Sequence, residues 1–123
     1  MYKARWCATM ALLLVWSVSA PAQKDQIKRV TDALPEKAPA KPKKKRRLLI
    51  FSRTAGFRHG SIAIGARAVT LMGDKTGAYL AVHTEDPSYF MPEKLKAFDA
   101  VLMLNTTGNC LRGKNEEELK KRL

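Results

Sequence analysis

The sequence predicts an α/β fold in which a parallel β-sheet carries helices on both faces. Three short apolar runs, at residues 47–52, 78–86 and 99–105, have the length and composition of buried strands. Segments with helical periodicity separate these runs, and polar turn residues follow each of them. The alternation of strand and helix indicates parallel pairing through right-handed crossovers.

The first strand and the helix after it carry the strongest patterns. RLLIFS (47–52) predicts a strand that is buried on both faces. Residues 60–77 predict a helix, because apolar residues recur there at steps of four, three and three. These residues are Ile62, Ala66, Val69 and Met72. Ser61 is the expected N-cap of this helix, and Gly73 is its expected exit.

The later elements continue the alternation. A second strand is expected at residues 78–86, a short helix at residues 91–98 with Pro92 in its first turn, and a third buried strand at residues 99–105. A last helix opens in NEEELKKRL, with acids before bases as the helix dipole prefers. Doubly wound sheets usually have about five strands. We therefore expect this chain to be the N-terminal part of a larger domain, with an exposed apolar sheet edge.

Two segments precede the predicted domain. Residues 1–22 combine a basic start, an apolar run and a small-residue site, APA, which is the pattern of a signal peptide. We expect export to the periplasm or the cell exterior, and the alternative is an uncleaved N-terminal anchor. Residues 23–46 are expected to form a disordered basic linker, because they hold few large apolar groups to offset the chain entropy.

The formal net charge of +12 is concentrated before the domain. Residues 23–47 hold ten basic and three acidic residues, whereas residues 48–123 hold eleven basic and eight acidic ones. The run KPKKKRR could contact an anionic surface, and its other interpretation is a solvated spacer. Nucleic acid is not expected as a partner, because the chain is predicted to be exported and no aromatic residue is interleaved with the basic run.

Common catalytic and cofactor motifs are absent from the sequence. It contains no G-x-G-x-x-G, Walker A or G-x-S-x-G pattern, and no His/Cys spacing that suggests zinc. We therefore expect neither a cofactor nor a metal. Cys110 is the only cysteine after the predicted leader, and we interpret it as a bystander.

Polar residues gather after the first and third predicted strands. In open parallel sheets, ligands bind beyond the carboxyl ends of the strands, where the strand order reverses. With strands in the order 2-1-3, the loops at residues 52–61 and 105–109 would face each other across one crevice. Both loops are rich in hydroxyl groups, amide groups and glycine, and glycine lets backbone approach a ligand closely. The sequence therefore predicts a ligand site between them.

Candidate roles in this site follow from the residue types. His59 is the candidate general acid or base, and Glu85 is a candidate carboxylate partner for it. The candidate ligand-binding residues are Arg58, Ser61, Asp86, Asn105, Thr106 and Thr107. Each candidate also has a structural interpretation. His59 could be a helix-entry residue hydrogen-bonded to a carbonyl, and Glu85 and Asp86 could form a turn before Pro87. The side chains of residues 105–107 could cap their own loop. His83 lies within the second strand and is predicted to be structural.

The segments LLIFSRTAGFRHGSI, HTEDPSYF and FDAVLMLNTTGN resemble, in order and spacing, the trehalose-utilisation (ThuA-like) family over residues 47–123. The resemblance implies the class I glutamine amidotransferase-like fold, which is a flavodoxin-like parallel sheet. It also adds Thr54 to the candidate ligand-binding residues. Family members continue into a glycine-rich strand and a His-Ser-type turn, so the fold expected here is truncated after about three strands.

The resemblance also implies a function linked to trehalose and related disaccharides, with a small sugar or glycoside as the partner. One hypothesis is an exported enzyme-like domain, hydrolase-like when full length, that processes a glycoside or keto-sugar with His59 as acid or base. A second is a non-catalytic carbohydrate-binding or scaffold module. A third is an inactive fragment of a larger protein.

Overall fold

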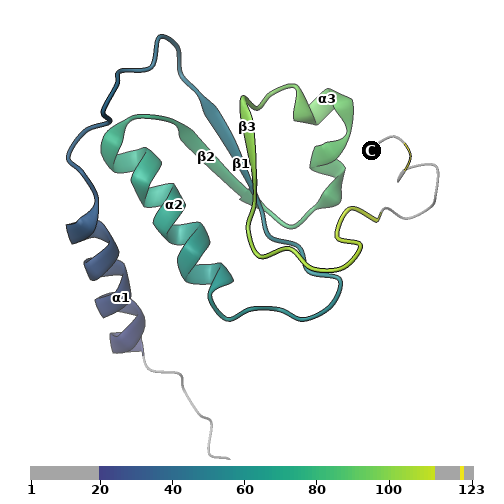
Figure 1. Cartoon of the computed structure of the whole chain (residues 1–123), viewed down its shortest axis with the longest axis horizontal. Helices are drawn as coiled ribbons and strands as arrows, with labels where there is room; N and C mark the ends of the chain where they lie inside the picture. The colour runs from purple at the N-terminus through teal and green to yellow at the C-terminus, as the bar shows by residue number, and fades with distance from the viewer. Residues whose placement is uncertain (1–19, 113–119, 121–123) are drawn as a thin grey trace, which may run out of the picture.

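The computed structural model describes residues 20–112 and residue 120. Its elements are α1 (Ala20–Ala33), β1 (Arg47–Phe51), α2 (Ile62–Thr76), β2 (Leu80–Thr84), the 3-10 helix η1 (Pro87–Phe90), α3 (Pro92–Leu95) and β3 (Ala100–Met103) (Figure 1). The last predicted helix and most of the predicted signal peptide lie outside the described residues. No helix among the described residues is long and apolar enough to cross a membrane.

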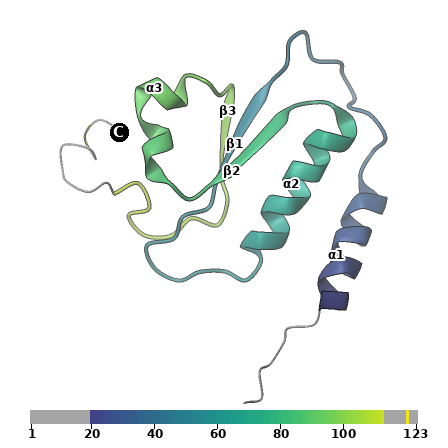
Figure 2. The ribbon, with the colours of Figure 1, turned by 180° about the vertical axis from the view of Figure 1, so that it is seen from behind.

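The three strands form one parallel sheet in the order β2-β1-β3. Figures 1 and 2 show α2 on one side of this sheet and α3 on the other. The central strand supplies the core, because Leu49, Ile50 and Phe51 are fully buried. The predicted α/β class, the parallel pairing and the strand order are confirmed.

Side chains of β1 alternate between the two faces of the sheet. The Phe51 ring meets the Phe90 ring of η1 edge-on, with 4.8 Å between centroids, so this face of the strand packs under η1. Ile50 and Ser52 therefore point to the opposite face, which α2 covers. Ile50 is paired in register with His83 of β2, which places His83 on that face as well.

β3 is less buried than the sequence predicted for it. Val101 and Met103 remain 39% and 42% exposed, although the sequence predicted a buried strand. The reason is position, since β3 lies at an edge of the sheet and pairs only with β1 among the described residues. The expected exposed apolar edge is thereby confirmed.

Helix α2 begins after Ser61 as predicted, but the predicted exit at Gly73 is wrong. The helix continues to Thr76, and Gly77 forms its left-handed C-cap with φ 66° and an N–H bond to the Gly73 carbonyl. Gly73 is instead a packing residue, because a Cβ there would lie 2.7 Å from the ring and the carbonyl oxygen of Tyr79. Met72, predicted on the buried face, is 40% exposed.

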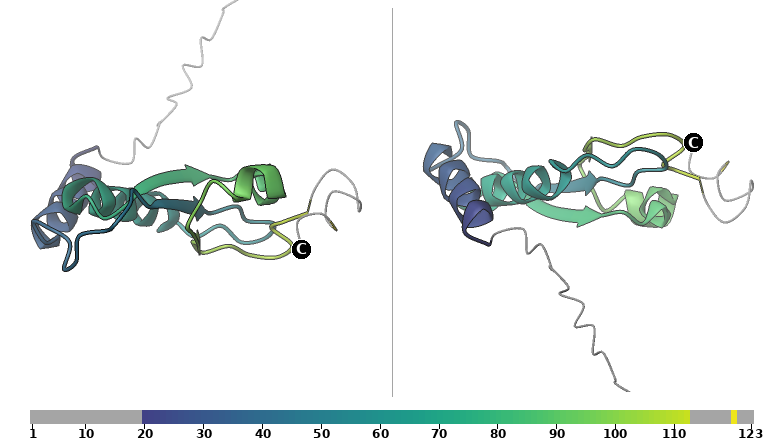
Figure 3. Two further views of the ribbon diagram at one scale, coloured as in Figure 1. Left: turned by 90° about the horizontal axis from the view of Figure 1, so that it is seen from above. Right: turned by 90° about the horizontal axis from the view of Figure 1, so that it is seen from below.

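The first part of the predicted disordered linker is helical in the structure, because α1 extends to Ala33. Figures 1 and 3 show α1 beside α2, at the end of the molecule away from α3. Lys75 of α2 fixes this contact: its ammonium donates to the carbonyls of Thr31 and Leu34 at 3.1 and 3.0 Å and pairs with Glu36 at 2.9 Å. These hydrogen bonds and this ion pair give the segment a support that its composition alone did not reveal.

The end of the basic run is fixed to the sheet by Asp99, which precedes β3. One carboxylate oxygen of Asp99 accepts from Arg46 at 2.8 Å and pairs with Lys44 at 3.0 Å. The other oxygen accepts from the Arg47 backbone N–H at 2.9 Å. These bonds, the one from Arg46 foremost, hold the pKa of Asp99 far below its ordinary value.

An Asp99→Asn variant is expected to melt at a lower temperature than the wild type at pH 7. Because the pKa of Asp99 is lowered on folding, its stabilising effect is complete above the pKa of an unfolded aspartate, about 3.9, and is lost as the pH falls toward the folded-state pKa. Thermal melts of both proteins at pH 7 and at the lowest pH that keeps them folded would measure this. Equal melting temperatures at pH 7 would contradict the assignment.

Candidate functional site

The two polar loops meet at the carboxyl end of the sheet, as the sequence predicted. Thr54 and Thr107 form an isolated parallel bridge, and the Ala55 N–H donates to the Thr107 carbonyl at 2.8 Å. The chain takes three steps from Phe51 to Thr54 but four from its partner Met103 to Thr107. The extra residue on the β3 side makes a local bulge, which bends the chain there.

The bulge contains Asn105, whose φ of 49° places it in the left-handed region. Asparagine adopts this conformation more readily than most residues. Its side-chain amide then donates to the Ser61 hydroxyl at 2.9 Å, next to the start of α2. Thr107 donates its hydroxyl to the Phe57 carbonyl at 2.9 Å. Three of the predicted ligand-binding residues thus also hold the two loops together.

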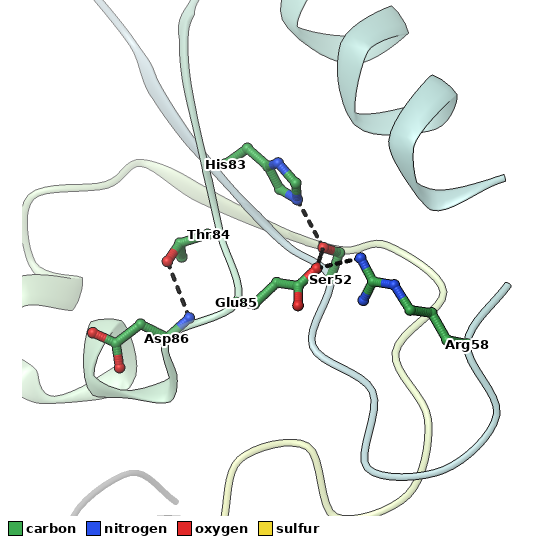
Figure 4. A network of polar contacts seen from close by, with 6 residues as sticks. All are labelled: Ser52, Arg58, His83, Thr84, Glu85 and Asp86. Carbon is green, nitrogen blue, oxygen red and sulfur yellow. Dashed lines mark hydrogen bonds and ion pairs between the residues drawn. The ribbon is translucent and has the colours of Figure 1, made fainter. Parts of the chain in front are cut away.

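A second cluster of polar side chains lies beside these loops, and we call it the Ser52 cluster: Ser52, Arg58, His83 and Glu85. The Ser52 Oγ lies 2.7 Å from His83 Nε2 and donates to Glu85 Oε1 at 3.2 Å. Arg58 donates to the same Glu85 oxygen at 2.7 Å. Figure 4 shows the four side chains converging: His83 from β2, Ser52 and Glu85 from just past the ends of β1 and β2, and Arg58 from the first loop.

Strand periodicity explains how the Ser52 cluster assembles. Ser52 follows Ile50 by two residues, and Glu85 follows His83 by two, so each pair projects from one face. Since Ile50 and His83 are register partners, the two later residues lie side by side just past the strand ends. Sequence reasoning identified Glu85 and Arg58 but missed Ser52 and His83. The spacing of two residues between His83 and Glu85 was the sequence signal that could have placed His83 on the same face as Glu85.

Glu85 is ionised at neutral pH in this cluster. The Arg58 hydrogen bond is the largest cause of a pKa below the ordinary value for glutamate, and partial burial opposes it less strongly. The Ser52 hydrogen bond lowers the pKa further. Glu85 is therefore a hydrogen-bond acceptor and a negative charge rather than a proton donor at neutral pH.

Comparison with protein families matches residues 47–123 to a family described as trehalose utilisation, ThuA. The chain belongs to the ThuA family. Neither a search of curated proteins nor one of solved structures finds a significant match. The family match includes all three strands, both loops and the Ser52 cluster. It confirms the resemblance seen in the sequence and supports a role related to trehalose utilisation.

His59 lies outside the Ser52 cluster of this ThuA domain. Its side chain is exposed, and its ring meets the ring of Phe57 edge-on at 4.9 Å between centroids. Its carbonyl accepts the N–H of Ile62 at 3.2 Å, which is the geometry of a residue at a helix entrance. The predicted acid–base role of His59 stays a prediction.

Asp86 and Thr106 complete the set of predicted residues. Asp86 is the N-cap of η1 and accepts the Ser88 N–H at 2.8 Å, so the turn expected before Pro87 is present. Its backbone N–H donates to the Thr84 hydroxyl at 3.1 Å. Thr106 is half-buried in the second loop. Among the residues that the ThuA structure describes, no group of three or more His, Cys, Asp or Glu side chains could hold a metal ion.

Proposed function

We propose that this ThuA domain binds a sugar or glycoside beyond the carboxyl end of its sheet. The observation that carries the proposal is the exposed Arg58–Glu85 ion pair beside the junction of two hydroxyl- and amide-rich loops. The side chains of Arg58 and Glu85 are 52% and 42% exposed, so a ligand can reach both. Membership of a trehalose-utilisation family supports a carbohydrate rather than another polar ligand.

The Arg58–Glu85 ion pair can hydrogen-bond to neighbouring hydroxyl groups of a sugar ring. A guanidinium donates in a planar fork, and an ionised carboxylate accepts, so together they can bind hydroxyls that act as acceptor and donor. Hydrogen bonds to charged groups are roughly twice as strong as those between neutral groups. The 2.7 Å bond between Arg58 and Glu85 holds both groups in place before a ligand arrives.

A catalytic function requires a proton donor and acceptor as well as a binding surface. In the proposed enzyme, which would process a glycoside or keto-sugar, His59 is the candidate acid or base and Glu85 is a charged partner. In a binding or scaffold module, the same Arg58–Glu85 pair holds the sugar without turnover. Turnover of the sugar by the wild type separates the enzyme from the binding module. If His59 is the acid or base, His59→Ala should abolish that turnover and leave sugar affinity unchanged, whereas unchanged turnover would remove His59 from the mechanism.

We also propose that the chain is exported through residues 1–22. Cleavage after Ala22 would release a protein that starts inside α1, at Gln23. Intact mass of the protein recovered from the periplasm or medium should match residue 23 as the first residue. A cytoplasmic protein that retains residues 1–22 would contradict export.

Glu85→Ala is expected to weaken trehalose or keto-disaccharide binding by tenfold or more. Loss of a hydrogen bond to a charged group costs about 1.5–3 kcal/mol, which corresponds to that range. Isothermal titration of the full chain measures the affinity, and Glu93→Ala in α3 is the matched control because Glu93 is an exposed acid outside the site. Equal affinities for the wild type and Glu85→Ala would contradict the proposed site.

A further inference from the structure

The hydroxyl of Ser52 has two hydrogen-bond neighbours but a single proton. It lies 2.7 Å from His83 Nε2 and 3.2 Å from Glu85 Oε1. Ser52 is fully buried. Hydrogen bonds to protein atoms must therefore satisfy the hydroxyl, because a buried polar group without a partner is costly. The direction of one bond consequently fixes the direction of the other.

The direction of the bond to Glu85 follows from its charge. An ionised carboxylate can only accept hydrogen bonds, so the hydroxyl proton of Ser52 points to Glu85. The Ser52 oxygen can then only accept from the imidazole. The His83 Nε2 must accordingly carry a proton, which leaves Nδ1 without one when the ring is neutral.

We propose that His83 Nδ1 is a proton acceptor of this site, and that Ser52 is the positioning residue that holds the imidazole in its Nε2–H form. Within the described residues, Nδ1 makes no hydrogen bond, and the His83 side chain is exposed at the rim of the Ser52 cluster. The proposal deepens the sugar-binding function, and its ligand part rests on that function.

A sugar hydroxyl fits this acceptor. It would donate to Nδ1 while its oxygen or a neighbouring hydroxyl accepts from Arg58. If the hydroxyl loses its proton, its O–H bond breaks, the oxygen keeps the electron pair, and Nδ1 gains the N–H bond. The resulting imidazolium still donates Nε2–H to Ser52, and the negative charge of Glu85 lies on the other side of that hydroxyl. Arg58 and Glu85 are the charged side chains bonded within the cluster.

The state of His83 can be measured directly in the full chain. We would record long-range 1H–15N correlation spectra of 15N-histidine-labelled protein at about pH 8, where an ordinary imidazole with a pKa of about 6.5 is neutral. The expected result is a His83 ring that is protonated at Nε2, with an N–H proton that exchanges slowly because it is bonded to a buried hydroxyl. The exposed ring of His59 is the internal control and should show no slow proton.

Substitutions at Glu85 and Ser52 test whether these two residues hold His83 in its Nε2–H form. Glu85→Ala removes the acceptor and frees Ser52 to donate to His83, so the Nδ1–H form should gain population several-fold and the slow proton should disappear. Ser52→Ala should also remove the slow proton, whereas Glu93→Ala should change nothing. A wild-type His83 protonated at Nδ1, or an unchanged tautomer ratio in Glu85→Ala, would overturn the proposal.

Adding trehalose separates this proposal from the proposed function. If the sugar binds and the Nδ1 resonance of His83 shifts, both are supported. If the sugar binds but Nδ1 does not respond, His83 is not the acceptor and the sugar site stands. If calorimetry detects no binding while His83 is Nε2-protonated, the sugar site is overturned together with the ligand part of the proposal, and only the positioning role of Ser52 is supported.

Discussion

Replacing Gly73 with alanine is expected to lower the free energy of unfolding by up to about 2 kcal/mol. The new Cβ would lie 2.7 Å from the Tyr79 ring and from its carbonyl oxygen, and the carbonyl belongs to the backbone that leads into β2. Overpacking of this kind costs about 1–3 kcal/mol. Alanine regains about 1 kcal/mol of helix propensity, so the net loss is smaller than the full cost of the clash.

The matched control for Gly73 is Gly65 in the same helix. A Cβ at Gly65 would lie 3.4 Å from the end of the Leu104 side chain, which is ordinary contact with a group that can move. Gly65→Ala should therefore leave stability unchanged or raise it by up to about 1 kcal/mol. Urea unfolding followed by circular dichroism measures both variants. A Gly73→Ala protein as stable as Gly65→Ala would show that α2 does not pack closely on Tyr79.

Replacing Gly108 with alanine is expected to destabilise the protein by about 2–3 kcal/mol and to weaken sugar binding. Gly108 has a φ of 63°, where a side chain costs about 1–2 kcal/mol. A Cβ there would also lie 3.3 Å from the backbone of Ala55, at the point where the two loops meet. The substitution should push the loops apart and displace the first loop, which carries Arg58.

A Gly77→Ala variant separates the two effects of the Gly108 substitution, which are backbone strain and the close contact with Ala55. Gly77 has a similar φ of 66°, but nothing lies within 4 Å of a Cβ built on it. Gly77→Ala should therefore show the backbone strain alone, about 1–2 kcal/mol, with unchanged affinity for sugar. If both variants lose the same stability and both keep wild-type affinity, the contact between Gly108 and Ala55 does not hold the site.

Most of the sheet was predictable because its signals are local. Apolar runs indicated three strands, and alternation with helical segments indicated parallel pairing. The predicted range of residues 60–77 contains α2, but the packing role of Gly73 was not predictable, since glycine commonly marks a helix end and the contact with Tyr79 depends on a residue in the next segment. The helical α1 was also missed, because part of its support comes from Lys75, more than forty positions away in the chain.

The site was predictable in part. The meeting of the two loops was predicted for a parallel sheet with the flavodoxin-like strand order 2-1-3, which the family resemblance implies, and Arg58 and Glu85 were identified by residue type. Ser52 was missed because a serine at the end of an apolar run carries no signal of its own until its neighbours are known. His83 was interpreted as structural because it lies within a strand. Its hydrogen bond to Ser52 is consistent with that interpretation, and its exposed ring is the feature that the sequence did not predict.

The central claim is that the loops at residues 52–61 and 105–109 meet beyond the ends of β1 and β3. Nuclear Overhauser contacts between backbone protons test it most directly in solution. The account predicts contacts from Thr54 or Ala55 to Thr107 or Gly108, together with those between the paired strands. If the strands show their contacts and these loop residues show none to each other, the claim is contradicted.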